Sequence, residues 1–253
     1  TVAGCSRPMQ VPVSATGQSV TIGDGEIGGI YPELLRSLGG KDGCEFVLSP
    51  VPRARQELQF ETGKADLLVP ATRTPRRDEF GIFVPLTRSR ATIISLDPKR
   101  APFKSAYDLL ERKDVRVVLV RGFDYGVPYQ ELMEALQRQN RLILESDPVA
   151  VARVLKASPG DVTIMAPIIM VGAIQDDARV SDLADKLRFD PIAELPWGEN
   201  GLYLSKASLS KEDSATLQAL LNRPAVANTL WKSFQTYYPA SVLKESIRPR
   251  DSR

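Results

Sequence analysis

The chain has 253 residues, of which 43% are hydrophobic and 25% are charged. This composition is that of an ordinary globular protein and excludes fibrous and disordered classes. Lys and Arg number 33 against 31 Asp and Glu, and the charges are interspersed, so we expect no nucleic-acid partner. The sequence contains no histidine, which removes histidine-dependent catalytic triads and histidine metal sites. We therefore expect no enzyme, metal or cofactor.

The N-terminal region carries one of the two cysteines, Cys5, and the other is Cys44. Three interpretations stay open: a disulfide, two unrelated buried thiols, or a lipidated Cys5, since Val2–Cys5 (VAGC) resembles a lipoprotein cleavage box. No apolar run reaches the roughly 18 residues of a membrane-spanning helix. We expect a mature form whose signal sequence has been removed.

The first third of the chain alternates strand and helix patterns. We predict, in order, a strand at 9–13, a helix at 29–38, a strand at 45–48, a helix at 53–62 and a strand at 65–70. This alternation implies a parallel sheet with helices on both faces. In the common doubly wound order the first two strands are neighbours, so Cys5 and Cys44 would lie at the same end of both. That favours a disulfide with a Cα separation of about 5 to 6 Å and an extracytoplasmic protein.

The pattern changes at residues 83–96, which read as one long extended segment leaving the first lobe. The alternation then restarts, with helices predicted at 105–110, 127–137 and 148–156 and strands at 115–120, 141–144 and 162–165. A return crossing at 202–204 and helices at 211–221 and 225–237 complete the first lobe. We predict lobe 1 from 1–92 and 200–253, lobe 2 from 93–199, and a loosely ordered tail after Pro239.

The segment Gly63–Phe80, GKADLLVPATRTPRRDEF, resembles the motif of type II periplasmic solute-binding proteins of family 3, the amino-acid-binding branch of ABC transporter substrate-binding proteins. The resemblance implies an α/β fold of two doubly wound lobes joined by a two-crossing hinge. It also implies a monomer that holds a small molecule between the lobes and delivers it to a membrane transporter permease or to a sensor.

In that family an arginine of the motif grips a ligand carboxylate, and the matching position is Arg77. Thr72 matches a hydroxyl that helps to hold the ligand, and Thr74 matches a helix cap. The competing interpretation of Arg77 is a solvated surface charge beside Arg73 and Arg76. The motif position favours the ligand role, because a guanidinium pairs well with a carboxylate.

Across the expected cleft, Arg121–Tyr125 (RGFDY) matches the turn of the second lobe that completes the site. Phe123 and Tyr125 either cover the ligand or pack the lobe, and Asp124 is a polar candidate. Weaker candidate contacts lie elsewhere along the predicted opening: Ser14, Thr16, Gln18 and Trp197.

Two departures from the family motif concern charge. Arg53 stands where relatives place a stacking aromatic, so we expect a cationic cleft. The acid that receives a ligand ammonium is replaced by Ala166 or Pro167, and a buried ammonium without its partner is unfavourable by roughly 3 to 5 kcal/mol. We therefore expect an anionic ligand such as a mono- or dicarboxylate, with Asp124 as the ammonium anchor if an amino acid binds.

Three functions follow from the resemblance. The leading hypothesis is a periplasmic solute-binding protein for an ABC transporter that binds a small anionic or zwitterionic solute. A sensory module of the same fold is the second. A dehydratase-like enzyme is the third, and without histidine it would need a cleft acid such as Asp124 or Glu199.

Overall fold

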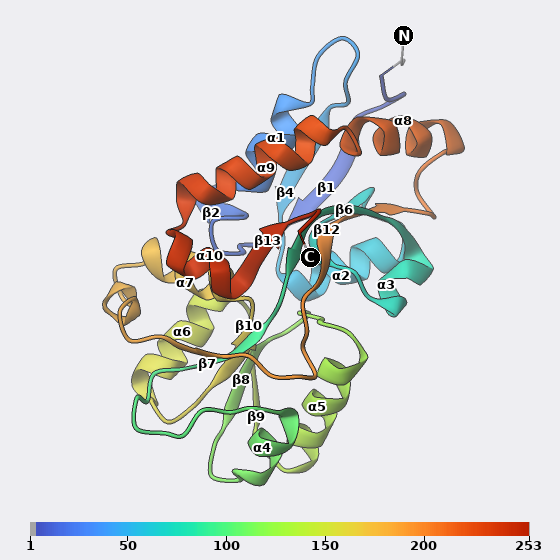
Figure 1. Cartoon of the computed structure of the whole chain (residues 1–253). Helices are drawn as coiled ribbons and strands as arrows, with labels where there is room; N and C mark the ends of the chain where they lie inside the picture. Colours follow the sequence, from blue (N-terminus) through green and yellow to red (C-terminus); the bar gives the residue numbers. More distant parts are fainter. Residues whose placement is uncertain (1–3, 253) are drawn as a thin grey trace.

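A computed structural model describes residues 4–252 and contains two α/β lobes (Figure 1). Lobe 1 contains β1 (Met9–Val13), the hairpin β2 (Thr21–Gly23) and β3 (Glu26–Gly28), α1 (Ile30–Ser37), β4 (Phe46–Pro50), α2 (Arg53–Glu61), β5 (Leu67–Thr72), α3 (Pro75–Phe80), β6 (Gly81–Ser89), β12 (Gly198–Ser205), α8 (Lys211–Leu221), α9 (Pro224–Tyr237), α10 (Ala240–Ser246) and β13 (Ile247–Pro249). Lobe 2 contains β7 (Thr92–Ser95), α4 (Ala106–Glu111), β8 (Val117–Val120), α5 (Val127–Arg138), β9 (Leu142–Glu145), α6 (Pro148–Ala157), β10 (Thr163–Met165), α7 (Pro167–Gln175), the 3₁₀ turn η1 (Ser181–Leu183) and β11 (Arg188–Asp190).

The central sheet of lobe 1 begins with β1, whose Met9, Val11 and Val13 are fully buried while Gln10 is exposed. β1 pairs in parallel with β4, and the Asp66 N–H donates to the Gln10 carbonyl at 2.8 Å, which places β5 on the other side of β1. β5, β12, β6 and β13 continue as antiparallel neighbours. The parallel pairing of β1 with β4 is as predicted. The antiparallel pairing of β5, β12, β6 and β13 was not predicted.

The parallel pairing of β1 and β4 explains the cysteines. Cys5 and Cys44 each precede one of these strands, and the register aligns Met9 with Phe46. The two cysteines form a disulfide with a Cα separation of 5.0 Å. The predicted bridge is therefore confirmed, while residues 1–3 of the lipoprotein-box interpretation lie outside the described residues.

Lobe 2 has two small sheets with an apolar core on each side of them. β7 lies between β10 and β11 in an antiparallel sheet, and β8 pairs in parallel with β9. The Val118 N–H donates to the Val162 carbonyl at 2.8 Å, which joins β8 to the chain that enters β10. Buried side chains of β7, β8 and β10 pack against α5 on one side of the strands and against α6 on the other.

The chain crosses between the lobes twice, from β6 to β7 and from β11 to β12 (Figure 1). The single extended segment expected at 83–96 is broken at Arg90, whose N–H donates to the Ser246 carbonyl at 3.1 Å instead of to a sheet neighbour. The second crossing enters β12, which extends the predicted return at 202–204 to Gly198–Ser205.

The C-terminal tail and α7 differ from expectation. The tail is ordered, because α10 and β13 bury Leu243 and Ile247 and β13 pairs with the end of β6. α7 was not predicted: it is apolar on all sides and almost wholly buried, so its sequence has no amphipathic period. It lies beside α10 of lobe 1 (Figure 1). Among residues 4–252, no helix is both long and apolar enough to cross a membrane.

Candidate functional site

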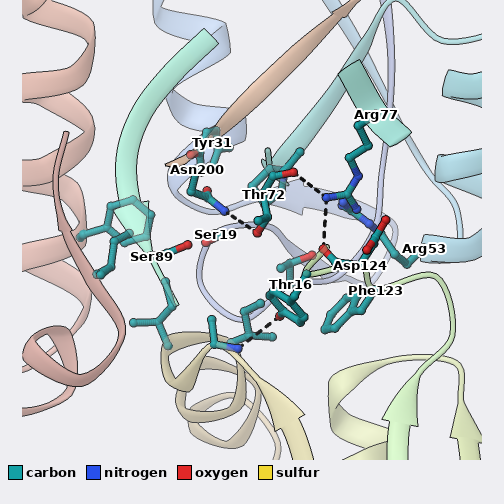
Figure 2. Close-up of a pocket in the computed structure, with 18 residues that line it drawn as sticks. Thr16, Ser19, Tyr31, Arg53, Thr72, Arg77, Ser89, Phe123, Asp124 and Asn200 are labelled. Carbon is teal, nitrogen blue, oxygen red and sulfur yellow. Dashed lines mark hydrogen bonds between the residues drawn. The ribbon is translucent and has the colours of Figure 1, made fainter. Parts of the chain in front are cut away.

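A pocket lies between the two lobes, and its empty volume, including the mouth, is about 570 Å³. Lobe 1 contributes mainly polar side chains and lobe 2 mainly apolar ones. Figure 2 shows Arg53 and Arg77 at one end of the pocket and Tyr31, Ser89 and Asn200 toward the other. The pocket therefore has a charged end and an end of hydroxyl and amide groups.

Arg77 reaches the pocket from the first turn of α3. Thr74 caps this helix, since its Oγ1 accepts the Arg77 N–H at 3.1 Å. The Arg77 side chain is only 4% exposed, which contradicts the surface-charge interpretation. Its Nη1 donates to the Thr72 carbonyl at 2.8 Å and, across the cleft, to the Asp124 carbonyl at 3.3 Å (Figure 2). One guanidinium thus bonds to both lobes.

Glu57 is a site residue that the sequence analysis missed. It lies one turn after Arg53 on α2, and its carboxylate accepts from Nε of Arg77 at 3.4 Å and from Nη2 of the same guanidinium. Arg53 Nη2 lies 3.2 Å from the same carboxylate. The i, i+4 spacing of Arg53 and Glu57 was a readable signal, but the contact with Arg77 joins two helices and has no sequence signature.

Burial and mutual attraction shift the pKa values of Arg53, Glu57 and Arg77. Burial opposes ionisation of Glu57, but the positive charges of Arg77 and Arg53 outweigh it and keep the pKa of Glu57 below its ordinary value. Burial likewise opposes the charge of Arg77, and the Glu57 carboxylate reverses the effect and raises the pKa of Arg77. For Arg53 burial prevails and lowers its pKa. Glu57 therefore offsets one of the two positive charges, and the cleft is less cationic than the two arginines alone would make it.

The second-lobe turn closes the pocket opposite Arg77. Gly122 has a φ of +93°, and a Cβ there would meet the Ala54 backbone nitrogen at 2.7 Å, so only glycine permits this approach to α2. Asp124 accepts the Gly126 N–H at 2.9 Å. Tyr125 accepts the Ala166 N–H at 3.2 Å, and burial raises the pKa of this phenol to about 12. Phe123, Asp124 and Tyr125 of the predicted turn line the pocket, whereas Arg121 is exposed and does not.

Three of the weaker candidates lie in the loop after β1, and one of them lines the pocket. Thr16 lines the pocket, and its hydroxyl donates to the Ser14 carbonyl at 2.9 Å. Ser14 and Gln18 lie outside the lining of this pocket. The Ser14 hydroxyl donates to Gln56 at 2.8 Å, and the Gln18 amide donates to Asp176 of lobe 2 at 2.6 Å.

Trp197 is also outside the pocket lining. The guanidinium of Arg90 lies 4.7 Å from the centre of its ring and that of Arg248 lies 3.9 Å from it. Trp197 thus packs at the second crossing, and the hinge-packing alternative describes its position. Glu199, the other acid considered for catalysis, lies 3.5 Å from Arg73 and has a half-exposed side chain outside the pocket lining.

Several hydroxyl and amide groups of the pocket were not predicted. Tyr31 is buried at the start of α1, and within residues 4–252 its hydroxyl has no hydrogen-bond partner. Asn200, on β12, donates to the Thr72 hydroxyl at 3.2 Å. Ser19 and Ser89 complete this end. The sequence carries no signal for Tyr31, which is one of several apolar-face residues of an amphipathic helix. Asn200 lies three residues after Trp197, a predicted candidate.

Comparisons with known proteins identify the fold. No protein-family model matches the sequence, and no curated protein matches it. An amino acid ABC transporter substrate-binding protein from Streptococcus pneumoniae, solved with L-arginine, is 19% identical, with 93% of this chain and 96% of that chain covered and a TM-score of 0.69. EhuB in complex with hydroxyectoine is 15% identical, with 94% and 92% covered and a TM-score of 0.71.

A histidine kinase sensor domain similar to periplasmic binding proteins is 17% identical, with 92% of this chain and 96% of that chain covered and a TM-score of 0.70. These likenesses extend over nearly the whole chain and confirm the predicted type II, periplasmic-binding-protein-like fold. The resemblance stated from Gly63–Phe80 is thus confirmed at the level of fold, because identities this low carry no further assignment.

Proposed function

We propose that the protein is an extracytoplasmic solute-binding protein that captures one small polar solute between its lobes for an ABC transporter. The observation that carries this proposal is the Arg77 guanidinium, which bonds to Thr72 in one lobe and to Asp124 in the other. A group that bonds to both lobes links occupation of the pocket to closure of the hinge. The Cys5–Cys44 disulfide supports an oxidising compartment.

The similarity to the histidine kinase sensor domain supports a second candidate, a module that reports the same solute to a signalling partner. Both candidates need the same pocket and the same closure. They differ in the partner, so a pull-down with the transporter permease or the kinase encoded beside this gene separates them.

The contacts of Glu57 and Asp124 support a protein that binds its solute without catalysing a reaction on it. Glu57 is held as an anion by two guanidinium groups, which suits a structural counter-ion and not a general acid near neutral pH. Asp124 accepts a hydrogen bond from the Gly126 N–H.

Native mass spectrometry of the purified protein tests the proposal. We expect a one-to-one adduct with a small molecule that is recovered chemically unchanged after prolonged incubation. Arg77→Met is expected to lower the affinity for the recovered molecule, because closure loses its cross-lobe bond. Recovery of a converted molecule would support the enzyme, and an adduct insensitive to Arg77→Met and Arg53→Met would contradict a site between the lobes.

A further inference from the structure

The guanidinium of Arg77 is almost fully engaged by the protein itself. An arginine side chain has five N–H donors. Glu57 accepts from Nε and Nη2 in a two-pronged pair, and the carbonyls of Thr72 and Asp124 accept from Nη1. This fork-to-fork arrangement is the one that a guanidinium adopts with a bound carboxylate. On Arg77 that place is taken by a side chain of the same lobe.

Arg53 has a hydrogen-bond donor that no protein group accepts within residues 4–252. Its Nη1 donates to Gln56 at 3.3 Å and its Nη2 pairs with Glu57. Its Nε, however, is buried and has no partner within residues 4–252, as is true of the Tyr31 hydroxyl. Both residues line the pocket and are at least 95% buried. Buried polar atoms are almost always hydrogen-bonded, so this donor and this hydroxyl mark where a solute completes the site.

The formal charges around the pocket cancel. Arg53 and Arg77 are positive, and Glu57 and Asp124 are negative. A solute with a net negative charge would bring an unbalanced anion into a buried site that already holds Glu57. A solute without net charge would not.

We propose that Glu57 is an internal counter-anion that occupies on Arg77 the place of a ligand carboxylate, so that the pocket selects a polar solute without net negative charge, received by Arg53 Nε and the Tyr31 hydroxyl. The inference rests on the proposed function of the pocket. It replaces the mono- or dicarboxylate expected from the two arginines with an uncharged or zwitterionic solute that carries hydrogen-bonding groups for Ser19, Ser89 and Asn200.

Chemical rescue tests the counter-anion without knowledge of the ligand. In Glu57→Ala the space between the two guanidinium groups is vacated, and acetate is expected to fill it. The thermal midpoint of the variant should rise in a saturable way by about 2 to 4 °C in acetate relative to chloride at equal ionic strength. The wild type should show no such rise.

Glu61→Ala is the matched control, because Glu61 lies on the same helix and pairs with the exposed Arg76. It should show no acetate-specific rise. Equal responses of both variants, or no response of Glu57→Ala, overturns the counter-anion. If Glu57→Ala does not fold in chloride, its refolding yields in acetate and in chloride are compared, and equal yields overturn it.

Matched solute pairs test the ligand class by calorimetry: glutamine with glutamate, asparagine with aspartate, and succinamide with succinate. In the wild type we expect the member without net negative charge to bind at least about tenfold more tightly, and Glu57→Gln should shift this ratio toward the anion by at least about tenfold. Tighter binding of the anionic members by the wild type overturns the inference and leaves solute binding intact. Failure of the proposed function is distinct, since it appears as no solute adduct at all.

Discussion

The ion pair between α3 and α2 gives the sharpest stability prediction. Arg77 is 4% exposed and Glu57 is 15% exposed, so removing either leaves the other charge buried. We expect Arg77→Met and Glu57→Gln each to lower the free energy of unfolding by about 3 to 5 kcal/mol. The double variant should lose less than the sum, with a coupling energy above about 2 kcal/mol.

The same two helices supply the control pair. Arg76 and Glu61 also join α3 to α2, but the Arg76 side chain is 67% exposed. Arg76→Met and Glu61→Gln should couple by no more than about 1 kcal/mol. Urea unfolding of the four single and two double variants gives both coupling energies. Similar values for the two pairs would refute the argument that burial makes the Arg77–Glu57 pair important.

The pH dependence of this coupling follows from the sign of the Glu57 shift. Its pKa is lower in the folded than in the unfolded protein, so the pair stabilises the fold fully above the unfolded pKa of about 4.3. The stabilisation is lost as the pH falls through the folded pKa. The coupling energy should therefore be constant from pH 8 to 6 and decline in acid, and a coupling that grows in acid would contradict the assignment.

Three further predictions concern other parts of the molecule. Replacing both Cys5 and Cys44 by Ser opens a loop with a sequence separation of 39 and should cost about 4 kcal/mol in denaturant unfolding; a loss below about 1 kcal/mol would contradict this. Gly122→Ala should hinder closure, because the added Cβ would meet the Ala54 backbone, and small-angle scattering should show a larger radius of gyration than for the wild type. Trp197→Ala removes two cation–π contacts at the hinge and should lower stability by about 1 to 2 kcal/mol with unchanged solute affinity by calorimetry, whereas a tenfold loss of affinity would place Trp197 in the site.

Much of the fold was predictable because local patterns decided it. Strand β1 is a short, largely buried apolar run and helix α8 has helical spacing, and both occur at their predicted bounds. The parallel neighbours β1 and β4 then fix the end of the sheet at which Cys5 and Cys44 meet. α7 could not be found in the same way, since burial on every side removes the period that reveals a helix.

The site was predictable only where a motif or a turn marked it. Arg77 and residues 123–125 lie at the pocket because the strand-to-helix junctions that carry them face the cleft. Packing between elements distant in sequence brings Glu57, Tyr31 and Ser89 to the site. No spacing of residues along the chain predicts such a position. The side chain of Gln18 donates a hydrogen bond to Asp176 of lobe 2 and does not line the pocket.

The central claim is that both lobes hold one solute. A crystal structure of the protein with its co-purified solute tests it most directly. The account predicts density between the lobes, within hydrogen-bonding distance of Arg53 Nε and in contact with the turn at 122–125, with the Arg77–Glu57 pair intact. A solute bound to one lobe alone, or one whose carboxylate displaces Glu57 from Arg77, would contradict it.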